Sequence, residues 1–155
     1  PNGIVTAATL GKTTASATAF TYPEVLDLKH SLDPAYRNSP NFGFMFHDTV
    51  LLAFKKLVDS QNRPLWMPSY VAGQPDLIDG TRYYINQDMD NTINTASKLI
   101  LSGDFSKYIV RIVQDMIIAR RDELYSENGL IGFQGWMRFD GELINTAAVK
   151  YLITA

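Results

Sequence analysis

One stretch of the chain, Leu99 to Val113, constrains the fold more than any other. It begins with the apolar run Leu99-Ile-Leu101 and then reaches Ser-Gly-Asp. That triplet predicts a turn, because glycine adopts positive φ at little cost and aspartate accepts hydrogen bonds from nearby backbone. From Tyr108 to Val113, apolar residues occupy both alternating sets of positions, broken only by Arg111. A strand with two largely apolar faces is predicted to lie inside a layered domain, covered on both sides.

Two helices are predicted ahead of this stretch. The first begins at Thr21, whose hydroxyl and the carboxylate of Glu24 have the spacing of a capping box, and it ends at Pro34. The second begins at Asp48, a good N-cap residue, and apolar residues follow at helical spacing up to Val58.

Short apolar or alternating runs predict strands in much of the remaining chain. These runs are residues 41–46, 82–86, 116–120, 130–139 and 148–153. Asp140-Gly141 is typical of a hairpin turn. The first twenty residues are mostly small and polar, and predict a linker or surface loop. Two helices and about six or seven strands that do not alternate regularly indicate an α+β domain.

The composition argues against several classes of protein. The chain has 155 residues, 46% of them hydrophobic, and a formal net charge of -2, whereas a nucleic-acid-binding protein concentrates Lys and Arg. It has no cysteine, which excludes disulfides and thiolate metal sites. No apolar run reaches the roughly 18 residues of a membrane span, and no signal peptide is visible. The chain begins at Pro1, so we expect it to be the later part of a longer protein.

Candidates for catalysis or metal binding are few. His47 beside Asp48 is the best pair, but adjacent residues at a strand-to-helix junction point apart. Asp88-Met-Asp90 begins like a calcium loop, yet Ile93 stands where the turn glycine belongs. The sequence therefore predicts no catalytic residue, no cofactor and no metal site.

The segment from Leu65 to Gly80 has little periodicity and indicates a long ordered loop, a kind of segment that often carries function, and its part from Trp66 to Asp79 is rich in aromatic residues and proline. Its large, stiff side chains suit a surface that contacts other copies of the chain. Packing of Trp66 on the second helix is an equally good interpretation for that residue. Trp66 and Tyr70 also suggest a platform for stacking sugars.

Short segments spread along nearly the whole chain are similar, in order and spacing, to those of one known family. They are Asn2-Gly-Ile-Val5, Thr21-Tyr-Pro-Glu-Val-Leu-Asp-Leu28, Phe44-Met-Phe-His-Asp-Thr49, Leu57-Val-Asp-Ser-Gln-Asn-Arg-Pro-Leu-Trp66, Leu77-Ile-Asp-Gly80, Leu101-Ser-Gly-Asp-Phe-Ser106, Arg138-Phe-Asp-Gly141 and Ala148-Val-Lys-Tyr-Leu152. The chain resembles the C-terminal half of the tailed-phage major capsid proteins with the HK97-like fold. It departs from that family at Asn62, where a turn glycine is usual, although asparagine tolerates left-handed backbone. Arg82-Tyr83 also replaces a common Tyr-Pro.

This resemblance implies a fold and a division of the chain. The expected fold is an axial domain, with a mixed sheet flanked by helices, plus the returning strands of a peripheral domain. Residues 1–20 would be a linker segment, 21–116 an axial-type α+β domain, and 117–155 strands returning to a peripheral-type domain.

The resemblance also implies a non-enzymatic, structural role. The protein would be the major shell subunit of a tailed phage or prophage and would self-assemble into hexamers and pentamers of an icosahedral head. Its location would be the virion, after assembly in the cytoplasm of the host bacterium. Scaffolding or decoration proteins are further expected partners, with packaged DNA only in non-specific contact and no membrane.

By resemblance, the loop lies near the capsomer axis, which makes its residues candidates for a subunit interface. The candidate set is Trp66, Met67, Pro68, Tyr70, Gln74, Pro75, Arg111 and Arg138. Two other functions stay open. One is an encapsulin-type shell, which has the same fold but holds enzyme cargo. The other is a small hydrolase or sugar-binding module that uses His47 and the aromatic loop 66–79.

Overall fold

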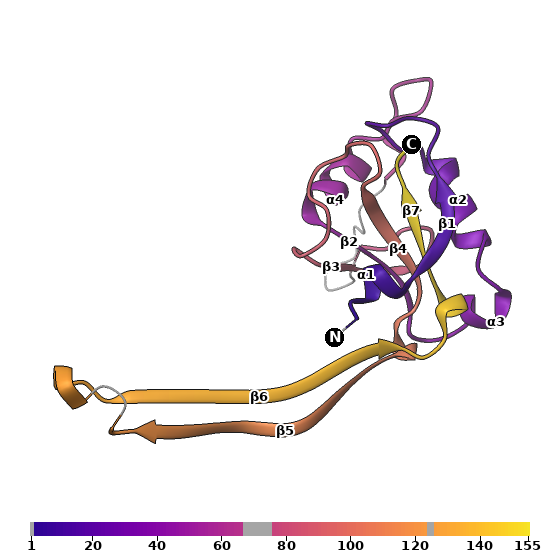
Figure 1. Ribbon diagram of the computed structural model, residues 1–155. Coiled ribbons are helices and arrows are strands. Elements are labelled where there is room, and N and C mark those ends of the chain that lie inside the picture. Colours follow the sequence, from indigo (N-terminus) through magenta and orange to yellow (C-terminus); the bar gives the residue numbers. More distant parts are fainter. Residues whose placement is uncertain (1, 67–75, 124–125) are drawn as a thin grey trace.

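The computed structural model describes residues 2–66, 76–123 and 126–155. A five-stranded sheet with helices on both faces, here called the body, carries a long two-stranded ribbon (Figure 1). The strands of the body are β1 (Thr9–Thr13), β2 (Phe42–Phe46), β3 (Arg82–Ile85), β4 (Lys98–Asp104) and β7 (Val149–Ile153). The ribbon consists of β5 (Tyr108–Arg121) and β6 (Gly132–Leu143). The helices are α1 (Ile4–Ala7), α2 (Tyr22–His30), α3 (Pro34–Arg37) and α4 (Asp48–Lys55), with 3-10 turns at Phe105–Lys107, Ser126–Asn128 and Thr146–Ala148. The predicted α+β class is confirmed.

The sheet of the body has the strand order β1-β7-β4-β2-β3. The central strand β4 runs antiparallel to both of its neighbours, β7 and β2, and each edge strand is parallel to its neighbour. The sequence interpretation grouped residues 149–153 with strands of a peripheral-type domain. Their pairing with both β1 and β4 instead puts β7 inside the body.

Residues 1–20 contain regular structure that the prediction of a linker missed. They include α1 and the edge strand β1. The polar composition was misleading because an edge strand is held through its backbone, here by parallel pairing with β7. Gly11 lets β1 approach α2 closely, since a Cβ there would lie 2.5 Å from a methyl carbon of Leu28.

Each face of the sheet has its own apolar core, because successive side chains of a strand point to opposite sides. On one face, α2 and α4 pack against the sheet. The buried members of that core are Phe20, Val25, Leu28, Phe44, Phe46, Val50, Phe54, Ile78, Leu99, Ile100 and Leu152. On the other face, a smaller core lies beside α1 and the base of the ribbon. It consists of Ala8, Met89, Leu101, Leu143 and Val149.

The predicted capping box at the start of α2 is confirmed. Glu24 Oε2 accepts hydrogen bonds from the backbone N–H of Thr21 at 2.7 Å and from its hydroxyl at 2.9 Å. The helix stops earlier than predicted, with Ser31 as its C-cap, and Pro34 begins the next helix instead of ending this one. A proline in the first turn is well tolerated, because the N–H it lacks has no partner within the helix.

The stretch Leu99 to Val113 differs from its prediction in two ways. First, β4 continues through Ser102 and Gly103, and the turn comes after Asp104, whose carboxylate accepts a hydrogen bond from Ser106 N at 3.0 Å. Second, the strand expected to be buried is exposed: the side chains of Val110 and Ile112 are 57% and 56% exposed. The strand continues to residue 121 and includes the separate strand predicted at 116–120.

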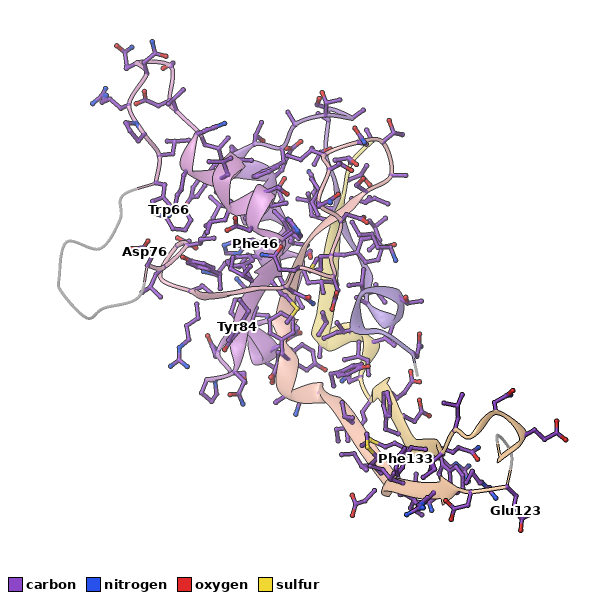
Figure 2. All side chains as sticks on the ribbon, turned by 90° about the vertical axis from the view of Figure 1, so that its left-hand side faces the viewer. Phe46, Trp66, Asp76, Tyr84, Glu123 and Phe133 are labelled. Carbon is purple, nitrogen blue, oxygen red and sulfur yellow. The ribbon has the colours of Figure 1, made fainter. Side chains whose placement is uncertain are left out.

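β6 pairs antiparallel with β5 along almost its whole length. The Asp140-Gly141 pair, predicted to form a hairpin turn, lies inside β6 instead. Figure 2 shows side chains of the ribbon, Phe133 among them, standing far from core residues of the body such as Phe46.

A candidate self-association surface

The register of the ribbon separates its side chains into two faces. Residues opposite each other in an antiparallel pair share a face. One set of opposed pairs is Val110–Gly141, Ile112–Phe139, Ile118–Gly135 and Arg120–Phe133. The other set is Ile109–Glu142, Arg111–Asp140, Gln114–Arg138, Ile117–Trp136 and Ala119–Gln134. The pairing of β5 is irregular between residues 112 and 117, so odd and even positions of β5 do not follow one face throughout. Along β6 the residues of the two sets alternate regularly and point to opposite sides.

The first set forms what we call the apolar face. Its large apolar side chains are Val110, Ile112, Ile118, Phe133, Met137 and Phe139, with Met137 assigned by alternation along β6, and Arg120 lies opposite Phe133 at its outer end. All of them are exposed, Phe133 by 72%. A soluble monomer rarely exposes so long a row of apolar side chains unless the row is a contact surface. The apolar face is therefore the strongest candidate for a binding surface in the described part of the chain.

The second set forms a mixed face. It brings together the two arginines that the sequence interpretation named as interface candidates, because Arg111 lies opposite Asp140 and Arg138 lies opposite Gln114. Ile117 and Trp136 form an apolar pair farther along the same face. The arginines thus share one side of the ribbon, away from the apolar face, and their role at an interface stays a prediction.

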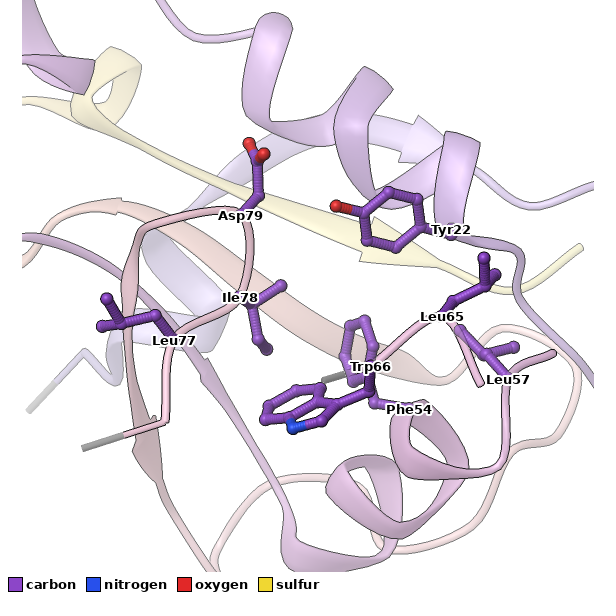
Figure 3. A pocket seen from close by; sticks show the side chains of 8 residues that line it. All are labelled: Tyr22, Phe54, Leu57, Leu65, Trp66, Leu77, Ile78 and Asp79. Atoms are coloured by element: carbon purple, nitrogen blue, oxygen red, sulfur yellow. The ribbon is translucent and has the colours of Figure 1, made fainter. Parts of the chain in front are cut away.

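Trp66 packs into the body. Its ring centre lies 6.3 Å from that of Phe54 on α4 and 5.7 Å from that of Tyr83 on β3. Figure 3 shows the indole beside Phe54 at the edge of a cavity of about 60 Å³. This geometry fits the interpretation in which Trp66 packs on the second helix. The other loop candidates, Met67, Pro68, Tyr70, Gln74 and Pro75, lie outside the described residues.

The end of this loop is anchored to α2. Lys29 Nζ donates to the backbone carbonyl of Asp79 at 3.1 Å and forms an ion pair with its carboxylate at 2.6 Å. Asp79 and Gly80 both have positive φ, 48° and 68°, which makes a tight turn there. Burial, together with the nearby Asp79 carboxylate, raises the pKa of Tyr22, which also lines the cavity. The cavity is thus lined by structural groups.

His47 has a structural role that the sequence analysis gave to Asp48. It is the N-cap residue of α4, and its Nδ1 accepts a hydrogen bond from Thr49 N at 3.1 Å. The Thr49 hydroxyl in turn donates to the carbonyl of Asn91 at 2.7 Å, which ties the start of the helix to the loop before β4. Cap geometry therefore accounts for the position of this ring.

In residues 2–66, 76–123 and 126–155, no group of three or more His, Asp or Glu side chains is placed to hold a metal ion. No helix there is long and apolar enough to cross a membrane.

Comparisons with known proteins agree with this geometry. The family model described as "Phage capsid family" matches residues 1–153. No curated protein matches the chain. Among solved structures, the capsid of a native GTA particle superposes on the whole chain with a TM-score of 0.83 and 27% identity, and the capsid of an empty GTA particle on 94% of it, with 0.76 and 28%.

A structure from Gordonia phage Cozz has the same fold, with a TM-score of 0.67 over 96% of the chain at 16% identity. The chain spans 56% of the native GTA capsid chain and 50% of each of the other two chains. These matches confirm the predicted likeness to HK97-like capsid shells. With a family match over residues 1–153, the chain belongs to the phage capsid family.

Proposed function

We propose that this chain is part of the major shell subunit of a tailed phage or prophage, which assembles with copies of itself into the hexamers and pentamers of an icosahedral head. The family match along residues 1–153 carries the proposal. The exposed apolar face supports it, because a structural subunit needs surfaces that become buried on assembly. The role is structural and not enzymatic.

The proposal includes a revised division of the chain. We assign the body to the axial-type domain and the ribbon to the peripheral-type domain. Strand pairing supports this division, since β7 belongs to the sheet of the body and β5 pairs only with β6 among the described strands. Residue 116, the boundary expected from the sequence, lies in the middle of β5.

The proposed partners are mainly other copies of the chain. Packaged DNA would make only non-specific contact, because residues 108–143 contain four arginines and no lysine against six carboxylates. Assembly in the host cytoplasm and contacts with scaffolding or decoration proteins belong to the same proposal. The matched structures favour a phage head over an encapsulin-type shell, since two of them are capsids of GTA particles. No observation favours a hydrolase or sugar-binding module.

Electron microscopy of the full-length protein after expression tests the proposal. We expect shells, and Phe139→Ser should reduce them to capsomers or free subunits, because it removes an apolar side chain from the apolar face. The matched control is Leu10→Ser on β1, where a side chain of similar exposure, 52% against 54%, lies outside the ribbon. Both variants should unfold at the temperature of the parent.

Two results would overturn the proposal. The first is a full-length protein that stays monomeric under every condition in which its relatives form particles. The second is a Phe139→Ser variant that assembles as well as the control. Shells loaded with a cellular enzyme instead of nucleic acid would identify the encapsulin-type alternative.

A further inference from the structure

The base of the ribbon is held by one residue at the start of the described chain. Asn2 donates its backbone N–H to the carbonyl of Gly141 on β6 at 3.0 Å, and its own carbonyl accepts a hydrogen bond from the Tyr108 hydroxyl on β5 at 2.9 Å. Its side-chain amide donates to Glu142 Oε1 at 3.2 Å. Asn2 thus contacts both strands of the ribbon at the point where they leave the body.

The local sequence is suited to this contact. A Cβ at Gly141 would lie 3.0 Å from Cζ of Tyr108 and closer still to its hydroxyl oxygen. Glycine therefore leaves the space in which the tyrosine ring crosses the ribbon and reaches Asn2. The ring is also packed against the smaller core, together with Ile4 and Val5 of α1. The segment before α1 and the base of the ribbon consequently form one packed unit.

Few other hydrogen bonds of the described residues brace the ribbon against the body. Its two strands join the body through short 3-10 turns, and Ile144 N donates to the carbonyl of Lys107 at 3.0 Å between them. On the far side, the amide of Asn145 donates to the hydroxyl of Tyr36 on α3 at 2.7 Å. Both of these contacts lie in or beside the turns and not on the paired strands. Tyr108 and Leu143 pack into the smaller core, and among the hydrogen bonds of the described residues those of Asn2 join the paired strands themselves to a third segment at this end.

We propose that Asn2, Tyr108, Gly141 and Glu142 form a clasp that sets the direction of the ribbon relative to the sheet of the body. Release of the clasp lets the ribbon swing about the two turns, and a shift of the segment at residue 2 turns the ribbon with it. The clasp thereby couples that segment to the orientation of the apolar face. This inference does not depend on the proposed function. In a shell, the clasp would fix the angle between two contact surfaces of one subunit.

Distances between spin labels on the body and the ribbon test this proposal. The chain has no cysteine, so Lys56→Cys on the body and Leu130→Cys at the far end of the ribbon provide unique labelling sites. Double electron–electron resonance is recorded on the complete chain mixed with excess unlabelled chain, so that distances within one copy dominate. We expect one narrow distance distribution in the parent.

Tyr108→Phe removes the hydroxyl and keeps the ring, and Asn2→Pro removes the backbone N–H that binds Gly141. Each should broaden the distribution and shift its mean, without lowering the unfolding temperature of the body. The control, Tyr84→Phe on β3, removes a tyrosine hydroxyl while keeping the ring contact with Phe105. Unchanged distributions in both clasp variants would overturn the proposal. So would equal broadening in the control, because the effect would then not come from the clasp.

Discussion

Gly103 lies where β4 passes the turn that leads into β7, and this position has no room for a side chain. A Cβ there would lie 2.6 Å from the Cα of Val149 and closer still to the carbonyl oxygen of Ala148. Both are backbone atoms, which cannot rotate away as a side chain can. The glycine that suggested a turn in the sequence therefore permits a close approach of two strands inside the sheet.

Gly103→Ala should destabilise the body, because one methyl group must push two strands apart. The expected loss is about 1–3 kcal/mol in the free energy of unfolding, the usual range for overpacking a core. Urea unfolding followed by tryptophan fluorescence measures it.

The control for Gly103→Ala is Gly135→Ala on the ribbon. A Cβ at Gly135 would meet no atom within 4 Å, and the expected change is below about 0.5 kcal/mol. Equal effects at the two sites would show that close packing at Gly103 does not limit the stability.

Single residues were predictable where one local property decides their conformation. Asn62 was expected to take the place of a turn glycine, and its φ of 60° is left-handed. The N-cap of α4 was missed by one residue, because the imidazole of His47 and the carboxylate of Asp48 are both acceptors. The residue types alone do not decide whether the side chain of His47 or that of Asp48 accepts a hydrogen bond from the first backbone N–H groups of α4.

At the scale of elements, the cap of α2 holds the helix to the chain that precedes it. Glu24 accepts hydrogen bonds from both Thr21 and the backbone N–H of Ala15, the latter at 2.7 Å. Burial alone would raise the pKa of Glu24. The hydrogen bonds from Ala15 and Thr21, helped by the charge of Lys12, outweigh burial and lower that pKa. The ionised carboxylate therefore stabilises the fold.

The stabilisation by Glu24 should depend on pH in a defined direction. A group whose pKa is lowered in the folded state stabilises fully above its unfolded value, near 4.5, and loses this effect as the pH falls through the folded value. Glu24→Gln should cost about 1–2 kcal/mol at pH 7. The gap between parent and variant should narrow below pH 4.5. Urea unfolding of both proteins at pH 7 and at lower pH measures this.

Asp27→Asn on the exposed side of α2 is the control for this pH dependence. It alters a carboxylate in an ion pair with Lys12 that is open to solvent, so little change is expected at either pH. A gap between Glu24→Gln and the parent that is independent of pH would contradict the assigned role of the carboxylate.

Elements were predictable where their apolar side chains pack against other parts of the same chain, as those of α2, α4 and β2 do in the main core. The ribbon was not predictable in this way. Periodicity identified both faces of Tyr108–Val113 as largely apolar, but it does not reveal which chain covers them. The strand was interpreted as buried within its own domain, whereas the structure exposes it.

At the scale of the whole molecule, the ribbon beyond its base does not pack into the cores of the body. The main core contains residues of the body alone, and the ribbon contributes only Leu143 and Tyr108 at its base to the smaller core. Most apolar side chains of the ribbon are therefore not used to stabilise the body. The apolar face can consequently change without loss of the fold.

Shortening the ribbon tests this independence. In the shortened chain, an Asn-Gly turn between the paired residues Ile112 and Phe139 replaces residues 113–138, and the base of the ribbon is kept. The free energy of unfolding of the body should change by less than about 1 kcal/mol, since few packed contacts and only a modest loop entropy are affected. Thermal and urea unfolding measure it.

Leu143→Ala provides the contrast for the shortened ribbon. Leu143 is only 3% exposed in the smaller core, and its truncation should cost about 2–5 kcal/mol. If the shortened chain loses as much stability as Leu143→Ala, the ribbon and the body are one cooperative unit.

The position of β7 has a consequence for synthesis on the ribosome. Of the strands in the body, β7 is made last, yet it lies between β1 and β4. Until it emerges, β1 has no neighbour among the described strands of the sheet and β4 lacks one of its two described partners, so this sheet is completed only by residues 149–153. A copy truncated before Val149 cannot complete the sheet. Among the described strands, the sheet of the body is therefore complete only in subunits that have been translated through β7.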